Sequence, residues 1–215
     1  MFDNFYDIEN IDFGYVDTSN VTSMNDMFSD CNNLETVNLS SFDISNVTSF
    51  YMMFWFCSKL KTLNLNHFNT SNATNFGYMF SHCQSLEEVL INNFDVSNAT
   101  TFVAMFEHCQ NLKSLNLSSF NTSNVTNIDN MFNDCLNLTG LNLSNFNISN
   151  VTAMNNMFYF NNNLKMLDIS SFVFKDSINI SNVFIGLPAN ITMKVNSLSE
   201  NKIRSSLSNA NIIIV

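Results

Sequence analysis

Two histidine-cysteine neighbours, His82-Cys83 and His108-Cys109, are the residues of this chain best suited to chemistry. A histidine beside a cysteine can act as the base that generates a nucleophilic thiolate. The two pairs belong to a regular series, because the remaining cysteines continue the same spacing. A catalytic pair needs to occur only once. The repetition therefore raises the question of whether these residues build the fold instead.

The cysteines form a single column with a constant spacing: Cys31, Cys57, Cys83, Cys109 and Cys135. Phe5 and Asn161 stand in the same column, one period before it and one period after it. Zinc sites usually combine paired CxxC or Cys and His ligands at short spacing, and that pattern is absent here. Neighbours in a stack, about 4.8 Å apart, could form a disulfide. The odd number of cysteines, and the Phe and Asn that replace them, favour a stack of free, buried thiols.

The other titratable residues form no catalytic constellation. Glu87 and Glu88 are neighbours in an expected strand, so they point to opposite faces or straddle a turn. Asp17, Asp43 and Asp95 share a column in which other coils carry Asn, so a calcium ladder there would lose half its charge. Four glycines leave no phosphate-binding loop. We therefore expect no enzymatic activity, no catalytic residue, no metal site and no cofactor.

The composition argues against two classes of partner. The formal net charge is −10, whereas nucleic-acid binding needs clustered Lys and Arg. No apolar run approaches the roughly 20 residues that span a bilayer, and no signal-peptide pattern opens the chain. We expect no nucleic-acid partner and no membrane insertion by this part of the protein. If the protein is exported, its signal and anchor are expected outside this sequence.

One phrase recurs six times at a constant period. It reads SNVTSMNDMFSDC at 19–31 and SNVTSFYMMFWFC at 45–57, and it returns at 71–83, 97–109, 123–135 and 149–161. Met1 and Phe2 fall in the recurring Met-Phe column, so the solenoid is expected to begin with a partial coil ahead of the repeat at 19–31, which we count as the first coil. A period that never slips predicts a solenoid, in which each coil buries its apolar face only by stacking on its neighbours.

Each repeat has two halves. The apolar residues of the first half lie at spacings of three, three, one and three, which match one face of a short helix: Val21, Met24, Met27, Phe28 and Cys31. The second half has the LxxLxL arrangement of a short strand at 34–39. The prediction is an α/β, leucine-rich-repeat-like, right-handed solenoid of about seven coils. Each coil would contribute one short helix and one parallel strand to a sheet of roughly eight or nine strands.

The recurring SNxT letters predict a structural role at a tight corner. A corner leaves backbone groups unpaired, and a stacked Asn can bond the backbone of its own and the next coil. The ladder expected to do so is Asn20, Asn46, Asn72, Asn98, Asn124 and Asn150. The Thr column is expected to cap the short helices: Thr22, Thr48, Thr74, Thr100, Thr126 and Thr152. The alternative is an outward Thr ladder that binds ice.

The segment LKSLNLSSFNTSNVTNIDNMFNDCLNL, at 112–138, closely resembles the repeat of BspA-like leucine-rich-repeat surface proteins. The resemblance covers about residues 1–170 and departs at Asn161, where the pattern has Cys. It implies a cell-surface or secreted protein that adheres to host or matrix proteins, or to another surface protein, without enzymatic activity. It also implies that Cys83 and Cys109 point inward while His82 and His108 are surface residues.

The outward columns vary, and function is expected there. Opposite charges stack at Glu35, Lys61, Glu87 and Lys113, each pair worth a few tenths of a kcal/mol. Most coils carry small or polar residues beside the Met-Phe pair. The repeats at 45–57, 71–83 and 149–161 carry aromatic or bulky residues there instead. Such residues are enriched among binding hot spots, and the candidate binding site is Tyr51, Met52, Trp55, Phe56, Tyr78, Tyr159 and Phe160. The alternative is that these side chains pack on one another.

We therefore expect a non-enzymatic cell-surface repeat domain that mediates adhesion or macromolecular binding, with a structural or ice-binding solenoid as the alternative. The solenoid is expected over residues 1–195. A closing helix and strand are expected over 196–215, with Leu198, Ile203 and Leu207 on the packed face of the helix. The first strand, expected at 8–13, leaves an edge through which two copies could associate end to end.

Overall fold

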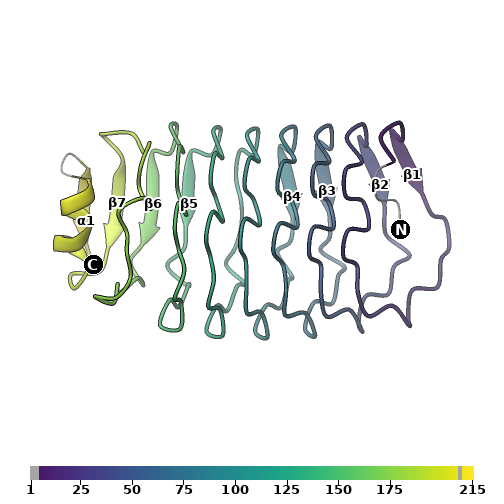
Figure 1. The fold of residues 1–215 in the computed structure, drawn as a ribbon, viewed down its shortest axis with the longest axis horizontal. Helices are drawn as coiled ribbons and strands as arrows, with labels where there is room; N and C mark the ends of the chain where they lie inside the picture. Colours follow the sequence, from purple (N-terminus) through teal and green to yellow (C-terminus); the bar gives the residue numbers. More distant parts are fainter. Residues whose placement is uncertain (1–4, 208–209) are drawn as a thin grey trace.

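The repeats wind into a parallel β-solenoid of about seven turns. A computed structural model describes residues 5–207 and 210–215, so Met1 and Phe2 lie outside the described part. The coils stack side by side along the long axis of the molecule (Figure 1). The regular elements in chain order are β1 (Asn10–Asp12), β2 (Thr36–Asn38), β3 (Thr62–Asn64), β4 (Glu88–Leu90), β5 (Gly140–Asn142), β6 (Met166–Ile169), β7 (Thr192–Val195), α1 (Glu200–Ser206) and β8 (Asn211–Ile214).

The strands of successive coils pair in parallel with a register of one repeat. Ile11 lies opposite Val37 in β1 and β2, and Leu63 lies opposite Val89 in β3 and β4. The strands form three sheets, β1-β2, β3-β4 and β5-β6-β7-β8, so the prediction of one continuous sheet is wrong. No strand forms at 112–117, and Figure 1 shows no arrow between β4 and β5.

The predicted helix in each coil is wrong, because the apolar run forms consecutive tight turns. In the first coil, Met27 N–H closes a turn by donating to Met24 C=O at 3.3 Å. Met24 N–H donates instead to Ser49 C=O of the next coil at 3.0 Å, and Asp26 N–H to Tyr51 C=O at 3.0 Å. Because no helix follows them, the Thr residues of the SNxT corners are not helix caps. The backbone thus divides its donors between its own turn and the neighbouring coil.

These turns require left-handed backbone at two columns of each repeat. The residues other than glycine with positive φ are Asp26, Asp30, Met52, Phe56, Tyr78, His82, Ala104, His108, Asn130, Asp134, Asn156 and Phe160. A spacing of three, three, one and three suits such turns as well as it suits a helix. A helix keeps its hydrogen bonds within one segment, whereas the turns leave every second N–H available for stacking. The stacking of identical coils therefore favours turns over helix.

The core consists of columns of identical side chains. One column stacks phenylalanine rings at centroid distances of 5.1 Å for Phe28–Phe54, 5.9 Å for Phe54–Phe80 and 5.4 Å for Phe80–Phe106. The same column continues through Phe132 to Phe158. All five cysteines lie in the described part of the chain, where they are buried and form no disulfide, so the prediction of a stack of buried thiols is confirmed.

A helix and a strand follow the last complete coil. Strand β8 pairs with β7 in parallel, and Ile203 of α1 is fully buried. Leu198 was predicted on the packed face of this helix, but it precedes α1 and is 78% exposed. The neighbouring Ser199 is the buried residue instead. Its hydroxyl donates to Phe172 C=O at 2.9 Å and accepts from Phe174 N–H at 3.2 Å, which ties the start of α1 to the coil beneath it.

Candidate functional site

The outward residues of the turn segment form the candidate site, which we call the outer-turn face. It consists of four columns that start at Asn25, Asp26, Ser29 and Asp30 and recur in every repeat through the sixth coil. The positions between them, Met24, Met27, Phe28 and Cys31, are buried in the core. The turn geometry thus separates a uniform interior from a variable exterior.

The histidine-cysteine neighbours do not form a nucleophilic pair. Cys83 is fully buried, and its thiol donates to Phe54 C=O of the preceding coil at 3.1 Å. Burial raises the pKa of the Cys83 thiol far above its ordinary value, because a thiolate there would lose its hydration. His82 points outward and contacts Ser81 Oγ at 2.9 Å. The two side chains therefore lie on opposite sides of the same turn.

Asn161 performs the work of a cysteine in the sixth coil. Its Nδ2 donates to Phe132 C=O at 2.8 Å, where Cys135 Sγ donates to Phe106 C=O at 3.1 Å one coil earlier. Its Oδ1 also accepts from Cys135 N–H at 2.9 Å. Asn161 is fully buried, so both polar ends of the amide are satisfied inside the core. This column therefore requires a small side chain that donates a hydrogen bond to a backbone C=O of the preceding coil, and either a thiol or an amide meets the requirement.

The aromatic residues predicted as a binding site form a cluster in the second and third coils. Tyr51 and Tyr78 meet edge to face at 5.8 Å, and Trp55 and Phe56 do so at 4.4 Å. These four side chains and Met52 are half-buried. They pack on one another, as the alternative interpretation expected, and they still present part of each ring to solvent.

Tyr159 and Phe160 form a separate pair in the sixth coil. Their rings meet edge to face at 4.4 Å, and Phe160 is 43% exposed. Four repeats separate Tyr159 from Trp55, which is about 19 Å at the spacing of hydrogen-bonded strands. The structure therefore divides the predicted site into a main cluster and a distant pair.

Three residues of the main cluster, Met52, Phe56 and Tyr78, occupy left-handed positions of the turns. A left-handed conformation is easy for Gly, Asn and Asp, and it costs other residues roughly 1–2 kcal/mol. Asp26, Asp30 and Asn130 meet that preference, whereas Phe56 and Tyr78 adopt φ of 58° and 57° with bulky side chains. The fold alone does not select aromatic residues at these positions.

A row of rings and one carboxylate connects the cluster to the fifth coil, and the sequence interpretation missed it. Phe56 stacks on His82 at 4.0 Å, His82 lies 4.4 Å from His108, and His108 Nδ1 lies 2.8 Å from Asp134 Oδ2. Gln110 Nε2 also donates to Asp134 at 2.6 Å. The signal was present in the sequence, because these residues share one column. The contacts between these column neighbours could be inferred only once the segments were known to stack as turns and not as helices.

The two histidines of this row differ in environment. Burial first, and then the neighbouring His108, lower the pKa of His82 while Asp134 opposes them, and the net pKa is about 4. His82 is therefore neutral near pH 7, and it stacks as an uncharged ring between Phe56 and His108. The row thus begins as an aromatic stack and ends as a histidine-carboxylate contact.

The polar corner columns face solvent and bond along the stack. From the second coil onward each Asn of the ladder donates to a Ser C=O of the preceding coil, as Asn46 does to Ser19 at 2.8 Å and Asn150 to Ser123 at 2.7 Å. The Thr column is exposed in all six coils. Its hydroxyls donate to the preceding Thr C=O, at 3.1 Å for Thr48.

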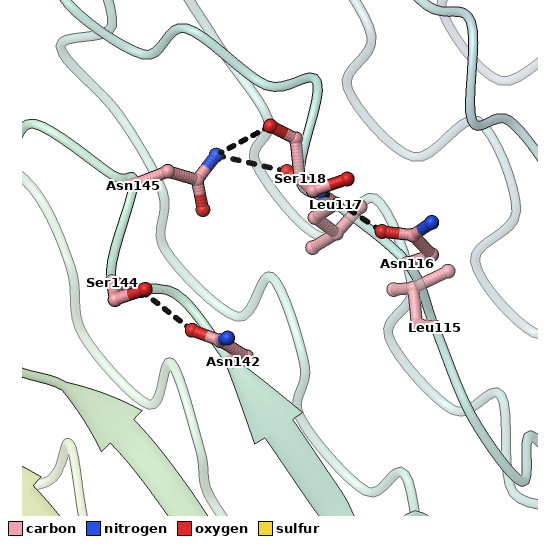
Figure 2. A pocket seen from close by; sticks show the side chains of 7 residues that line it. All are labelled: Leu115, Asn116, Leu117, Ser118, Asn142, Ser144 and Asn145. Atoms are coloured by element: carbon pink, nitrogen blue, oxygen red, sulfur yellow. Dashed lines mark hydrogen bonds between the residues drawn. The ribbon is translucent and has the colours of Figure 1, made fainter.

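A small cavity lies on another side of the molecule, where the sheet is interrupted. Its volume is about 140 Å³, and its lining contains no titratable side chain (Figure 2). Asn145 reaches across it and donates to Leu117 C=O at 2.9 Å, as Figure 2 shows. Its lining residues are Leu115, Asn116, Leu117, Ser118, Asn142, Ser144 and Asn145. The cavity is a gap between coils that the side-chain amide of Asn145 bridges.

The described residues contain neither a cluster suited to a metal ion nor a membrane-spanning helix. No group of three or more His, Cys, Asp or Glu side chains is placed to hold a metal ion in residues 5–207 and 210–215. Within the same ranges, no helix has the length and apolarity to cross a membrane. Two of the three expected ion pairs of the sheet side form, with Lys61 Nζ 3.5 Å from Glu35 Oε2 and Lys113 Nζ 2.5 Å from Glu87 Oε2. Among the described residues, Lys61 and Glu87 form no ion pair with each other.

Comparison with known families extends the repeat pattern to other proteins. Residues 1–114 and 87–196 match a family described as Mycoplasma protein of unknown function, DUF285. The chain belongs to the DUF285 family. The two matched segments overlap at 87–114, as a periodic sequence allows, and together they cover most of the solenoid. No curated protein matches the chain. The DUF285 match supports a repeat family, and the BspA-like resemblance stays a prediction.

Proposed function

We propose that this DUF285 chain is a non-enzymatic, cell-surface or secreted repeat domain that binds another macromolecule through its outer-turn face. The observation that carries the proposal is the aromatic cluster around Tyr51, Trp55 and Phe56. Phe56 stands at a left-handed position that favours Asn, Asp or Gly, and all three side chains remain partly exposed. Rigid aromatic side chains contribute large contact areas at low entropic cost, so they dominate the binding energy of many interfaces. Host or matrix proteins are the proposed partners.

The test uses substitutions that the repeat itself supplies. Ser29 and Ser81 occupy the column of Trp55, and Asn25 and Asn155 occupy the column of Tyr51. The double variant Trp55→Ser with Tyr51→Asn should therefore keep the fold. Purified wild-type and variant proteins are compared on an immobilised panel of matrix proteins and glycans. The wild type should bind at least one of them and the variant should lose most of that binding. Undiminished binding by the variant would contradict the proposal.

An ice-binding solenoid is the second candidate, because the Thr column is exposed along six coils. Stacked coils place such hydroxyls at a regular spacing of about 4.8 Å. Each hydroxyl from Thr48 onward already donates its hydrogen to the preceding Thr C=O, so it can only accept from ice. Thermal hysteresis that disappears in a Thr74→Val, Thr100→Val variant would favour this candidate over macromolecular binding.

End-to-end association is proposed as a property of the N-terminal coil. Strand β1 pairs with β2 on one side only among the described residues. An apolar cavity of about 480 Å³ lies nearby and includes Phe13, Val21, Met24 and Phe42 in its lining. An unpaired edge beside apolar surface favours a second copy. Light scattering over a range of protein concentrations should show a dimer, and a monomer at high concentration would exclude it.

A further inference from the structure

In the fourth and fifth coils the outer-turn face carries negative charge that no lysine or arginine balances. Its carboxylates there are Glu107, Asp129 and Asp134, and none of them forms an ion pair with Lys or Arg within the described ranges. The chain's eight lysines and arginines all fall outside the turn segments of this face, at Lys59, Lys61, Lys113, Lys165, Lys175, Lys194, Lys202 and Arg204. On the sheet side, by contrast, Lys61 and Lys113 pair with glutamates. The fold thus neutralises acids on one side and leaves these three unbalanced on the other.

The carboxylates of the fifth coil are positioned by neutral donors. Asp129 Oδ1 accepts from the backbone and side-chain amides of Asn155, at 2.5 and 2.8 Å. Asp134 Oδ2 accepts from Gln110 and contacts His108. The second oxygen of each carboxylate has no hydrogen-bond partner within the described chain. These contacts orient the acids while preserving their capacity to bind a cation.

The negative charge reaches the aromatic cluster. The pKa of Tyr78 is raised by burial first, and then by the nearby Glu107, Tyr51 and Asp129. Glu107 lies in the adjacent coil and accepts from Ser81 Oγ at 3.2 Å, beside the ring of His82. Aromatic rings attract cations through their negative faces, and neighbouring carboxylates strengthen that attraction. The rings and acids therefore present one surface with a single electrostatic preference.

The dimensions of the surface suit an extended chain. The coil that carries Asp129 and Asp134 lies three repeats after the coil of Trp55. At the spacing of stacked strands this is a distance of about 14 Å. An extended peptide rises about 3.3 Å per residue, so roughly four residues bridge that distance. The row Phe56, His82 and His108 lies between the two ends as a continuous floor of rings.

We propose that the outer-turn face binds an extended, arginine- or lysine-rich segment of a partner protein, with one cation over the Tyr51–Trp55–Phe56 rings and another at Asp129 and Asp134. This inference rests on the proposed function and names the partner's chemistry. Arginine suits the aromatic end best, because its planar guanidinium stacks on rings and is weakly hydrated. Bidentate pairing with a carboxylate suits it equally at the acidic end.

The test uses a short synthetic peptide with two arginines four positions apart, and the same peptide with citrulline in place of arginine. Citrulline keeps the shape and removes the charge. Trp55 is the only tryptophan, so its emission reports on binding at the cluster without a label. The arginine peptide should change the emission and bind at least tenfold more tightly than the citrulline peptide. Added salt should weaken it.

Matched variants separate local from general electrostatics. Asp129→Asn with Asp134→Asn removes two charges from the outer-turn face and keeps an oxygen acceptor for the neighbouring donors. Glu35→Gln with Glu87→Gln removes two charges from the sheet side. The first pair should weaken the arginine peptide about fivefold, and the second pair should leave its affinity unchanged. Equal loss in both variants, or equal binding of the citrulline peptide, would overturn the proposal.

A second ligand class distinguishes this inference from the broader function. If neutral oligosaccharides change the Trp55 emission and the arginine peptide does not, the cationic partner is excluded while binding at the cluster stands. If the arginine peptide fails and Trp55→Ser with Tyr51→Asn still lowers binding on the matrix panel, only this inference fails. If the same aromatic variant leaves panel binding intact, the proposed function fails as well.

Discussion

The buried amide of Asn161 offers a quantitative test of how the coils are joined. In Asn161→Ala the bond to Phe132 C=O and the bond from Cys135 N–H are both lost. The Cys135 N–H can return to Phe132 C=O, because Cys109 N–H makes the equivalent bond to Phe106 C=O at 3.1 Å. The remaining cost is one unmade hydrogen bond, about 1–2 kcal/mol, and a cavity where the amide was, about 1–2 kcal/mol. Together these give an expected loss of about 2–4 kcal/mol in the free energy of unfolding.

Asn161→Cys restores the residue that the five earlier coils carry. Its thiol should donate to Phe132 C=O as Cys135 does to Phe106 C=O at 3.1 Å. We expect this variant to lose less than about 1 kcal/mol, since it refills most of the cavity and remakes one donor. Urea unfolding followed by Trp55 fluorescence measures both variants, provided that the slope with urea stays constant. The reasoning would be refuted if Asn161→Cys were as unstable as Asn161→Ala.

Two further predictions concern the outer-turn face. The pKa of His82 is about 4 in the folded protein, and its ordinary value is 6.5. As the pH falls, the unfolded chain therefore binds this proton before the folded protein does. The contribution of His82 to the free energy of unfolding is complete above pH 6.5 and is lost toward pH 4. Allowing for solvent screening of this half-buried ring, we expect a loss of roughly 1–2 kcal/mol between those values, which is absent in His82→Asn when urea unfolding is compared at both pH values. Phe56→Asn should change the free energy of unfolding by less than about 1 kcal/mol, because relief of the left-handed backbone offsets lost ring contacts. Phe54→Asn, in the buried phenylalanine stack, should cost at least about 3 kcal/mol; equal effects of the two substitutions in thermal unfolding would contradict this assignment of outward and inward columns.

The sequence predicted the stacking of coils because its period never changes. The columns of Phe28 and Asn46 supply the same group at the same place in all six repeats, and the column of Cys31 does so in the first five; only a solenoid brings such groups together. Burial of the cysteines and the parallel strands followed from the same periodicity. The aromatic cluster was also visible, since Trp55 and Tyr51 depart from what the other coils carry in their columns.

The conformation of the turn segment was decided by tertiary structure. A spacing of three, three, one and three describes inward residues without specifying which backbone hydrogen bonds join them. Stacking made inter-coil bonds such as Met24 to Ser49 available, and these replaced the bonds of a helix. Because the segments form turns that stack closely, Phe56, His82, His108 and Asp134 of successive coils contact one another in one continuous row.

The sequence by itself determined that identical coils must stack, because a single coil buries too little apolar surface to fold alone. It also determined which columns are constant and which vary. Tertiary structure alone decided that backbone donors alternate between the local turn and the next coil. For that physical reason the outward side chains of neighbouring coils contact one another, and residues one repeat apart in the sequence form the continuous outer-turn face.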